Sequence, residues 1–319
     1  MRVSRRLRIL IIAVVVGCVA VGAWTAWGAR SGPSGAKFEP ADGDYYLGVS
    51  TDIGRLDAFD QAAGLGAGRH PAIYDQWTTP DGGVAQILAN AKTRAGMAPM
   101  ISWNLPMSGG QISSGRQDSY LKAQAAAVKA YGGPVFVRLD WEMNATWYPD
   151  WNTPAVSPAD FIAGWRHVYD VFKQAGAGNA AFVWSPTLWN GPGGLSPSTW
   201  YPGDGYVDWL GVDAYPQSAV QNFILTGAGG LDDTAAFAVK HGKPLMIAEW
   251  APALPQPDTT AAMDLIFAFA AAHPATVKAL VYFDFDTNGK DYTLKDHPVG
   301  AADFRKRVDG NGHVLLTLH

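Results

Sequence analysis

The middle of the 319-residue chain reads VFVRLDW at residues 135–141, PADFIAGWRHVYDVFKQA at 158–175 and AFVWS at 181–185. The outer runs are short and almost continuously apolar, whereas the middle run carries apolar residues at helical spacing. Ser157 and Pro158 are typical of a helix start. Two such strands joined by a helix indicate a parallel sheet that is buried on both faces.

The same alternation continues on both sides of this unit. We expect eight strands, at residues 45–50, 71–74, 98–103, 135–141, 181–185, 207–213, 244–249 and 279–285. We expect Ala-rich helices at residues 81–94, 117–131, 158–175, 232–241 and 259–273. Eight strands in a chain of this length favour a closed (β/α)₈ TIM barrel forming a single domain. An open doubly wound sheet is the alternative, but no Gly-rich phosphate loop follows the first strand.

The amino terminus predicts export. Four arginines precede an uncharged apolar run from Ile9 to Trp27, so residues 1–27 resemble a signal peptide or a membrane anchor. Positive charge before the run predicts that the rest of the chain lies outside the cell membrane, either secreted or anchored to its outer face. An uncleaved anchor, a cleaved signal and a lipoprotein modification at Cys18 all remain open. Cys18 is the only cysteine, so no disulfide is expected.

Residues 28–43 are rich in Gly, Pro, Ser and Ala and predict a linker, which places the folded domain at residues 44–319. The formal net charge is -4 and only 16% of residues are charged. Such a surface lacks the basic field that nucleic acid requires. We therefore expect a neutral partner, with membrane contact only through the amino-terminal segment.

Two glutamates occupy the positions where a TIM barrel places its chemistry, at the carboxyl ends of strands. Glu142 follows the fourth strand, where alternation puts Arg138, Asp140 and Glu142 on one side. Glu249 ends the seventh. Each alone could be a salt-bridged strand end, but strands four and seven face each other obliquely across a barrel mouth. The pair can then approach one glycosidic bond from two sides, as in retaining glycoside hydrolysis.

These residues resemble the motifs of glycoside hydrolase family 26. The segment Arg138 to Asn144, followed by Trp147-Tyr148-Pro149, resembles the strand that carries the family's acid/base. The sequences VWSP at 183–186, YPGD at 201–204 and VDWLGVD at 207–213 resemble its fifth and sixth strands, and 243–250 its nucleophile strand. The resemblance spans residues 45–285.

The resemblance implies that Glu142 is the acid/base and Glu249 the nucleophile, and that no cofactor is needed. It implies substrate contacts for Arg138, Asn144, Asp213 and Tyr215, with Tyr215 close to the nucleophile. Many members of the family cleave β-1,4-mannan, while others attack β-1,3-xylan or mixed-linkage β-glucan. A polysaccharide is therefore the expected partner, with mannan favoured by the family alone.

The chain departs from the family at Trp141, where a histidine usually precedes the acid/base. An indole donates one hydrogen bond and accepts none, so the contacts to the sugar at the cleavage site must differ. Other tryptophans near strand ends suit the apolar faces of sugar rings. They are Trp77, Trp103, Trp147, Trp151, Trp184, Trp189, Trp200 and Trp250.

A metal is not expected. The chain has no His-Glu-x-x-His pattern. Asp284, Asp286 and Asn288 begin like a calcium loop, but Lys295 stands where a bidentate glutamate should close it. Two hypotheses therefore remain: a retaining endo-acting hydrolase of a β-linked polysaccharide, and a catalytically silent glycan-binding barrel anchored at the cell surface.

Overall fold

The computed structural model describes residues 34–79, 82–148, 155–188, 194–216, 221–252 and 257–318. Its central strands are β1 (Tyr45–Ser50), β2 (Ile73–Thr78), β3 (Ala98–Trp103), β4 (Val135–Leu139), β5 (Ala180–Trp184), β6 (Trp209–Asp213), β7 (Leu245–Trp250) and β8 (Val277–Phe283). They are parallel and follow one another in chain order around the sheet. β1 also pairs with β8, from Tyr46 opposite Ala279 to Ser50 opposite Phe283, so the sheet is closed. The predicted TIM barrel is confirmed.

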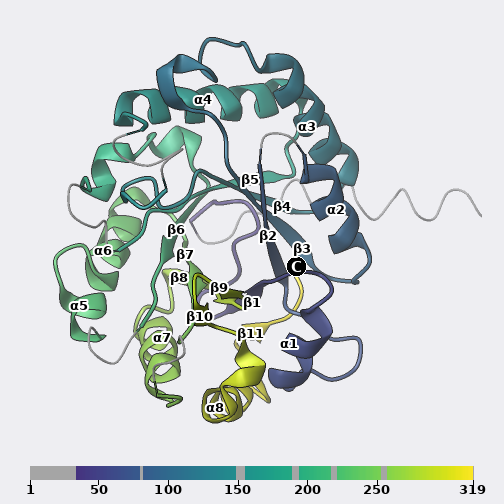
Figure 1. The fold of residues 1–319 in the computed structure, drawn as a ribbon, viewed down its shortest axis with the longest axis vertical. Coiled ribbons are helices and arrows are strands. Elements are labelled where there is room, and N and C mark those ends of the chain that lie inside the picture. The colour runs from purple at the N-terminus through teal and green to yellow at the C-terminus, as the bar shows by residue number, and fades with distance from the viewer. Residues whose placement is uncertain are drawn as a thin grey trace, which may run out of the picture.

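The helices surround the strands (Figure 1). They are α1 (Leu56–Ala62), α2 (Val84–Lys92), α3 (Asp118–Tyr131), α4 (Pro158–Ala175), α5 (Gln221–Thr226), α6 (Leu231–His241), α7 (Ala261–Ala272) and α8 (Pro298–Val308). The shorter pieces are β9 (Asp286–Thr287), β10 (Lys290–Asp291), β11 (Val314–Leu315) and the 3₁₀ turns η2 (Ser108–Gly110), η3 (Pro197–Trp200), η4 (Asp204–Tyr206) and η5 (Leu294–Asp296).

The ends of α4 follow from the sequence. The Ser157 hydroxyl accepts a hydrogen bond from the Asp160 amide at 3.1 Å, and Pro158 occupies the first turn, where its missing N–H costs nothing. Gly176 ends the helix at φ 72°, a left-handed conformation that suits glycine. The helix expected at residues 259–273 starts two residues later, since α7 begins at Ala261. The Asp258 carboxylate accepts the Val299 and Gly300 amides at the start of α8.

The amino end of the barrel is closed by residues just before β1. Phe38 is buried and meets Phe136 edge-to-face at 5.9 Å, and the Trp209 indole donates to the Lys37 carbonyl at 2.7 Å. The folded unit therefore includes part of the stretch predicted as a linker, because an apolar ring there fills the barrel interior. The two glutamates lie toward the opposite end, at the carboxyl ends of the strands.

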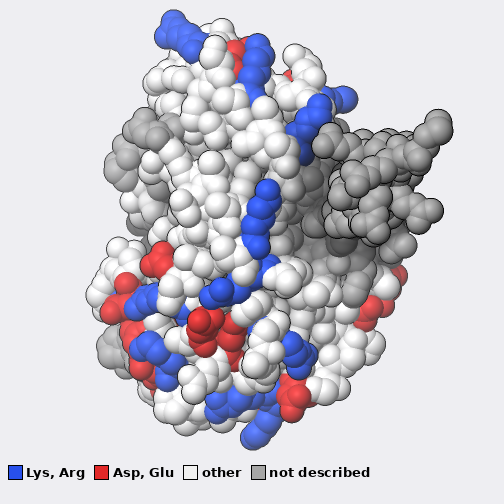
Figure 2. Space-filling view, turned by 90° about the vertical axis from the view of Figure 1, so that its right-hand side faces the viewer, with Lys and Arg blue, Asp and Glu red and all other residues white. Residues whose placement is uncertain are grey.

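The face in Figure 2, which shows the right-hand side of Figure 1, carries acidic and basic side chains among wide uncharged areas. No helix in the described ranges is long and apolar enough to cross a membrane. The predicted signal peptide or anchor at residues 1–27 lies outside the described residues, so its role stays a prediction.

Candidate active site

A tight turn after β4 sets the position of Glu142. The strand ends at Leu139, two residues earlier than expected, and the backbone is left-handed at Asp140 (φ 39°) and at Glu142 (φ 55°). This conformation is costly for residues with a side chain and recurs at functional sites. The Asp140 amide donates to the Trp103 carbonyl at 3.0 Å, and the Glu142 amide to the Ser185 carbonyl at 2.8 Å. The turn is thus fixed to the ends of β3 and β5.

The alternation expected for Arg138, Asp140 and Glu142 therefore stops at Leu139. Asp140 is fully buried, and its carboxylate accepts the Leu105 amide at 2.7 Å. This contact fastens the segment after β3. Asp140 therefore stabilises the backbone next to the site, while Arg138 and Glu142 face the site itself.

A β-bulge in β7 sets the position of Glu249. Val212 on β6 pairs with Ile247, but the next residue, Asp213, pairs with Glu249, so β7 has one extra residue. Ala248 belongs to the apolar cluster inside the barrel, and simple alternation would turn Glu249 outward. The bulge turns it inward, which is a common use of bulges near active sites.

The Arg138 guanidinium joins the carboxylates of β6 and β7. Its Nη1 donates to Glu249 Oε1 at 2.7 Å and to Ser102 Oγ at 3.2 Å, and its Nη2 donates to the Asp213 carboxylate. Arg138 is fully buried, as are Ser102 and, to within one per cent, Asp213. A buried charge needs such partners, and each carboxylate gains a fixed orientation from the arginine.

Tyr215 completes the contacts of Glu249. Its hydroxyl donates to Glu249 Oε2 at 2.5 Å, so each oxygen of this carboxylate accepts one hydrogen bond. The tyrosine lies beside the second glutamate as the resemblance implied. Glu249 is only 3% exposed. A carboxylate held in this way can present its remaining lone pairs to a bound molecule without rotating.

Glu142 has a different environment. The Trp147 indole donates to its Oε2 at 2.8 Å. Burial, and then the negative charge of Glu249, raise the pKa of Glu142 to about 7. In an acid and nucleophile pair, one carboxyl must hold a proton while the other must be ionised, and different surroundings of the two groups achieve this. Glu142 can hold a proton at neutral pH.

Asn144 ties two segments of the mouth together. Its Nδ2 donates to the Thr187 carbonyl at 2.9 Å, and its Oδ1 accepts the Thr187 amide at 3.0 Å. The side chain is fully buried. Its described contacts hold the segments after β4 and β5 in place, so the predicted substrate contact of Asn144 stays a prediction.

Aromatic rings run across the mouth from Glu142 to Glu249. We call this set the aromatic arc; in order, it contains Trp147, Tyr148, Trp141, Trp77, Phe283 and Tyr215. Trp141 stacks on Trp77 with ring centres 5.9 Å apart and lies over the Arg138 guanidinium at 5.4 Å. Trp77 and Trp147 are each 37% exposed, so both can meet a ligand. Trp141 therefore leans over the site despite its opposite strand parity.

Four of the predicted sugar-binding tryptophans lie elsewhere. One of them, Trp200, is fully buried and meets Phe161 of α4 edge-to-face at 5.6 Å. Trp103, Trp184 and Trp250 point outward from their strands and pack against aromatic residues of α3 and α4, of α6, and of α7 and α8, respectively. None is more than 2% exposed. Their predicted role is corrected to packing, because residues of this parity fill the layer between strands and helices. Trp151 and Trp189 lie outside the described residues.

Sequence reasoning missed Asp75 and its neighbours. Asp75 is fully buried on β2 and accepts hydrogen bonds from the hydroxyls of Ser50 and Ser102 at 2.7 Å each. The second strand was expected to end at Tyr74, which left Asp75 in a loop. The signal that could have found it is the period-two pattern of Asp75 and Trp77, which share the inward face.

The described residues contain no group of three or more His, Cys, Asp or Glu side chains that could hold a metal ion. The calcium-like sequence forms the hairpin of β9 and β10. Asn288 and Gly289 turn it, both left-handed at φ 55° and 69°, as short hairpin turns require.

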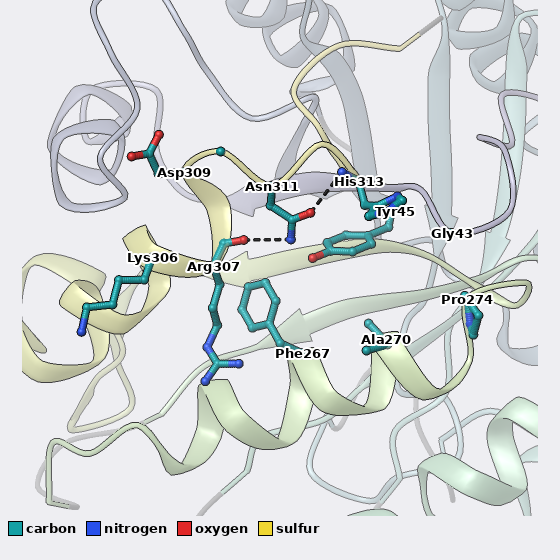
Figure 3. A pocket seen from close by; sticks show the side chains of 12 residues that line it. Gly43, Tyr45, Phe267, Ala270, Pro274, Lys306, Arg307, Asp309, Asn311 and His313 are labelled. Carbon is teal, nitrogen blue, oxygen red and sulfur yellow. Dashed lines mark hydrogen bonds between the residues drawn. The ribbon is translucent and has the colours of Figure 1, made fainter.

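A cavity of about 740 Å³ lies at the other end of the barrel (Figure 3). It is bounded by α7, by the end of α8 and by Tyr45, the first residue of β1. Arg307 and His313 also line it, and Asn311 bonds the backbone of both. Because this is the amino end of the strands, the cavity is separate from the two glutamates.

Comparisons with known proteins agree with this geometry. The model of the family described as glycosyl hydrolase family 26 matches residues 116–242. Endoglucanase H of Acetivibrio thermocellus is 30% identical over 190 residues, covering 56% of this chain and 21% of that protein. The β-1,3-xylanase TXYA of a Vibrio species is 26% identical over 221 residues, covering 67% and 42%. The chain thus spans less than half the length of either curated relative.

Solved structures share the barrel at low sequence identity. The YdhT protein of Bacillus subtilis has a TM-score of 0.63 at 18% identity, with 87% of this chain and 91% of that chain covered. A mannanase of the same species has a TM-score of 0.61 at 16% identity, with 87% of both chains covered. The matched segment and the curated relatives thus make this chain similar to glycosyl hydrolase family 26, and the solved structures share its barrel fold.

Proposed function

We propose that the chain is a retaining endo-glycoside hydrolase that cleaves a β-linked polysaccharide, with Glu142 as acid/base and Glu249 as nucleophile. The observation that carries the proposal is the difference between the two carboxyls. Arg138 and Tyr215 hold both oxygens of Glu249, whereas burial raises the pKa of Glu142 to about 7. One group is arranged to attack and the other to carry a proton.

The reaction would take two steps. Glu249 forms a bond to the anomeric carbon while the bond from that carbon to the glycosidic oxygen breaks, and Glu142 gives its proton to the leaving oxygen. In the second step water attacks the anomeric carbon, Glu142 takes a proton from that water, and Glu249 leaves as a carboxylate. Both steps invert the carbon, so the product retains its configuration.

A panel of β-glucan, β-1,3-xylan, β-mannan and β-1,4-xylan tests the proposal. New reducing ends should accumulate on at least one polymer, with internal cleavage shown by a rapid fall in viscosity. Proton NMR during the first minutes should show the β-anomer as the initial product. The α-anomer would refute the double displacement. Binding without new reducing ends would favour the glycan-binding alternative, which the exposed rings of Trp77 and Trp147 could support.

Two observations affect the choice of polysaccharide. The resemblance to the family favours mannan, but the curated relatives are named as an endoglucanase and a β-1,3-xylanase. Trp141 also lies over Arg138, where an imidazole could hydrogen-bond a sugar hydroxyl and an indole carbon face cannot. We propose β-glucan or β-1,3-xylan as better substrates than mannan.

Replacing Trp141 with histidine tests this ranking. Trp141→His should raise kcat/KM on mannan relative to the best other polymer by about ten-fold, because a polar site discriminates among hydroxyls more strongly than an apolar wall. Trp141→Phe is the matched control and should leave the ranking unchanged. Fast mannan cleavage by the wild type, with the same ranking in Trp141→His, would show that Trp141 only packs.

The pKa of Glu142 predicts a pH dependence. The leaving oxygen needs the protonated acid, so kcat/KM on polysaccharide should fall as pH rises through about 7. The pH profile of kcat/KM measures this directly. A basic limb above pH 9 would contradict the role of Glu142. An activated aryl glycoside is the control, because its leaving group needs less help and the limb should flatten.

We also propose that the enzyme acts outside the cell membrane. Residues 1–27, in which four arginines precede an apolar run, support export. A polysaccharide substrate would be encountered outside the cell.

A further inference from the structure

Asp75 is a buried carboxylate that the two-step reaction does not use. It lies on β2 inside the barrel and is fully buried. Its Oδ2 accepts the Ser50 hydroxyl and its Oδ1 accepts the Ser102 hydroxyl, each at 2.7 Å. Burial of a carboxylate costs free energy unless it is compensated, and among the described residues Asp75 has two hydroxyl donors and no cation in direct contact.

A short chain of hydrogen bonds connects Asp75 to Glu249. Ser102 gives its only proton to Asp75, so its Oγ turns a lone pair to Arg138 Nη1, which donates to it at 3.2 Å. The same Nη1 donates to Glu249 Oε1 at 2.7 Å. Asp75 thereby fixes the orientation of Ser102, and Ser102 fixes one nitrogen of the arginine that holds the nucleophile.

The charges around Arg138 give this connection an electrostatic effect. Arg138 from β4 faces Glu249 from β7 and Asp213 from β6, with Asp75 behind Ser102. The neighbours of Asp75 on β1 and β3 are the uncharged Ser50 and Ser102. An ionised Asp75 also attracts the Arg138 guanidinium, which weakens the attraction between the guanidinium and Glu249. The Glu249 carboxylate then keeps more of its negative charge available for attack.

We propose that Asp75 is a positioning residue, which holds Arg138 through Ser102 and keeps the Glu249 carboxylate reactive. The inference rests on the proposed function and deepens it. Asp75 does not contact the reacting atoms and acts only through Arg138.

Protonation of Asp75 should break this arrangement. Burial raises the pKa of Asp75 to about 6, although the Arg138 charge and both serine hydroxyls oppose the shift. As pH falls through about 6, Asp75 becomes neutral and no longer attracts the Arg138 guanidinium. The guanidinium then interacts more strongly with Glu249 and Asp213. The wild-type kcat should therefore decrease below about pH 6.

Kinetics of Asp75→Asn provide the first measurement. The amide is the same size but carries no charge, so kcat should fall about ten-fold while KM changes less than about two-fold. The decrease in kcat near pH 6 should vanish, because no group titrates at this position. A purely structural role would lower stability without removing this limb.

The scarcity of glutamate allows a second measurement that needs no turnover. The chain contains only Glu39, Glu142 and Glu249, so ¹³C-carboxyl-labelled glutamate yields three carboxyl signals in an NMR pH titration. The Glu249 signal should show a step near pH 6 that reports the ionisation of Asp75. Glu39, which accepts the Ser34 amide at 2.8 Å, is the reference and should lack it.

Three variants make the NMR result specific. Asp75→Asn should remove the step, and Ser102→Ala should shrink it by breaking the connection. Ser50→Ala should move it to higher pH, because ionised Asp75 loses a hydrogen bond on the side away from Arg138. An unchanged step in Asp75→Asn, or a wild-type kcat and pH profile in that variant, would overturn the proposal. A wild type that shows the step but cleaves no polymer would overturn the proposed function instead.

Discussion

Glu249→Ala should abolish the hydrolysis of every substrate, by about 10⁴-fold or more in kcat. No covalent intermediate can form without the carboxylate, and the vacancy leaves Arg138 and Tyr215 without their shared partner. A good leaving group cannot help, because the missing group is the one that attacks. Activated aryl glycosides should therefore lose as much activity as polysaccharides.

The measurement is initial rates on one polymer and one aryl glycoside, with unfolding temperature as a check of the fold. Glu39→Gln is the matched control, since Glu39 is the only glutamate besides the proposed pair and contacts Ser34 near the closed end of the barrel. It should retain wild-type rates. If Glu249→Ala still turns over the aryl glycoside, the nucleophile is another residue.

Glu142→Ala should separate the two kinds of substrate. On polysaccharide the loss should be about 10³-fold, because a sugar alkoxide leaves poorly without a proton. On an aryl glycoside with a good leaving group, the first step should lose less than about ten-fold. The covalent intermediate should then accumulate, because Glu142 is also the base that activates water in the second step.

A burst of released phenol followed by a slow steady state would demonstrate that accumulation. Azide, which needs no base, should speed the second step of Glu142→Ala and give a glycosyl azide of retained configuration. In Glu249→Ala, azide can only attack in place of the missing carboxylate, so any glycosyl azide should have the inverted configuration. Equal losses on both substrates in Glu142→Ala, together with a selective loss in Glu249→Ala, would mean that the roles are reversed.

The strands and long helices were predictable because their apolar patterns are strong. The bounds of β1, β3 and α4 agree with the runs in the sequence. Three helices, α1, α5 and α8, were not expected, and α5 has only six residues. α1 is only seven residues long, and α8 (PVGAADFRKRV) buries mainly small residues besides Phe304 and Val308. Short or weakly apolar helices are fixed by tertiary packing, which local sequence does not express.

Which residues meet at the barrel mouth was largely predictable, whereas their geometry was less so. The two glutamates, Arg138 and Tyr215 lie together because parallel strands end on one side of a barrel. The inward turn of Glu249 depends on a bulge, and the separation of Asp140 from Arg138 and Glu142 depends on a left-handed turn; simple alternation predicts neither. Trp103 was predicted to be exposed because it ends a strand. It is buried because its side chain points outward from the barrel, into the layer between strands and helices.

The backbone at Glu142 has a consequence for how such enzymes evolve. A left-handed φ of 55° costs roughly 1 kcal/mol for any residue other than glycine, and a buried carboxyl adds to that cost. If Glu142 is the proposed acid/base, natural selection for the reaction maintains a residue that selection for thermal stability alone would replace. A descendant that lost its catalytic duty would be free to drift toward glycine at position 142, becoming inert and more heat-resistant at once.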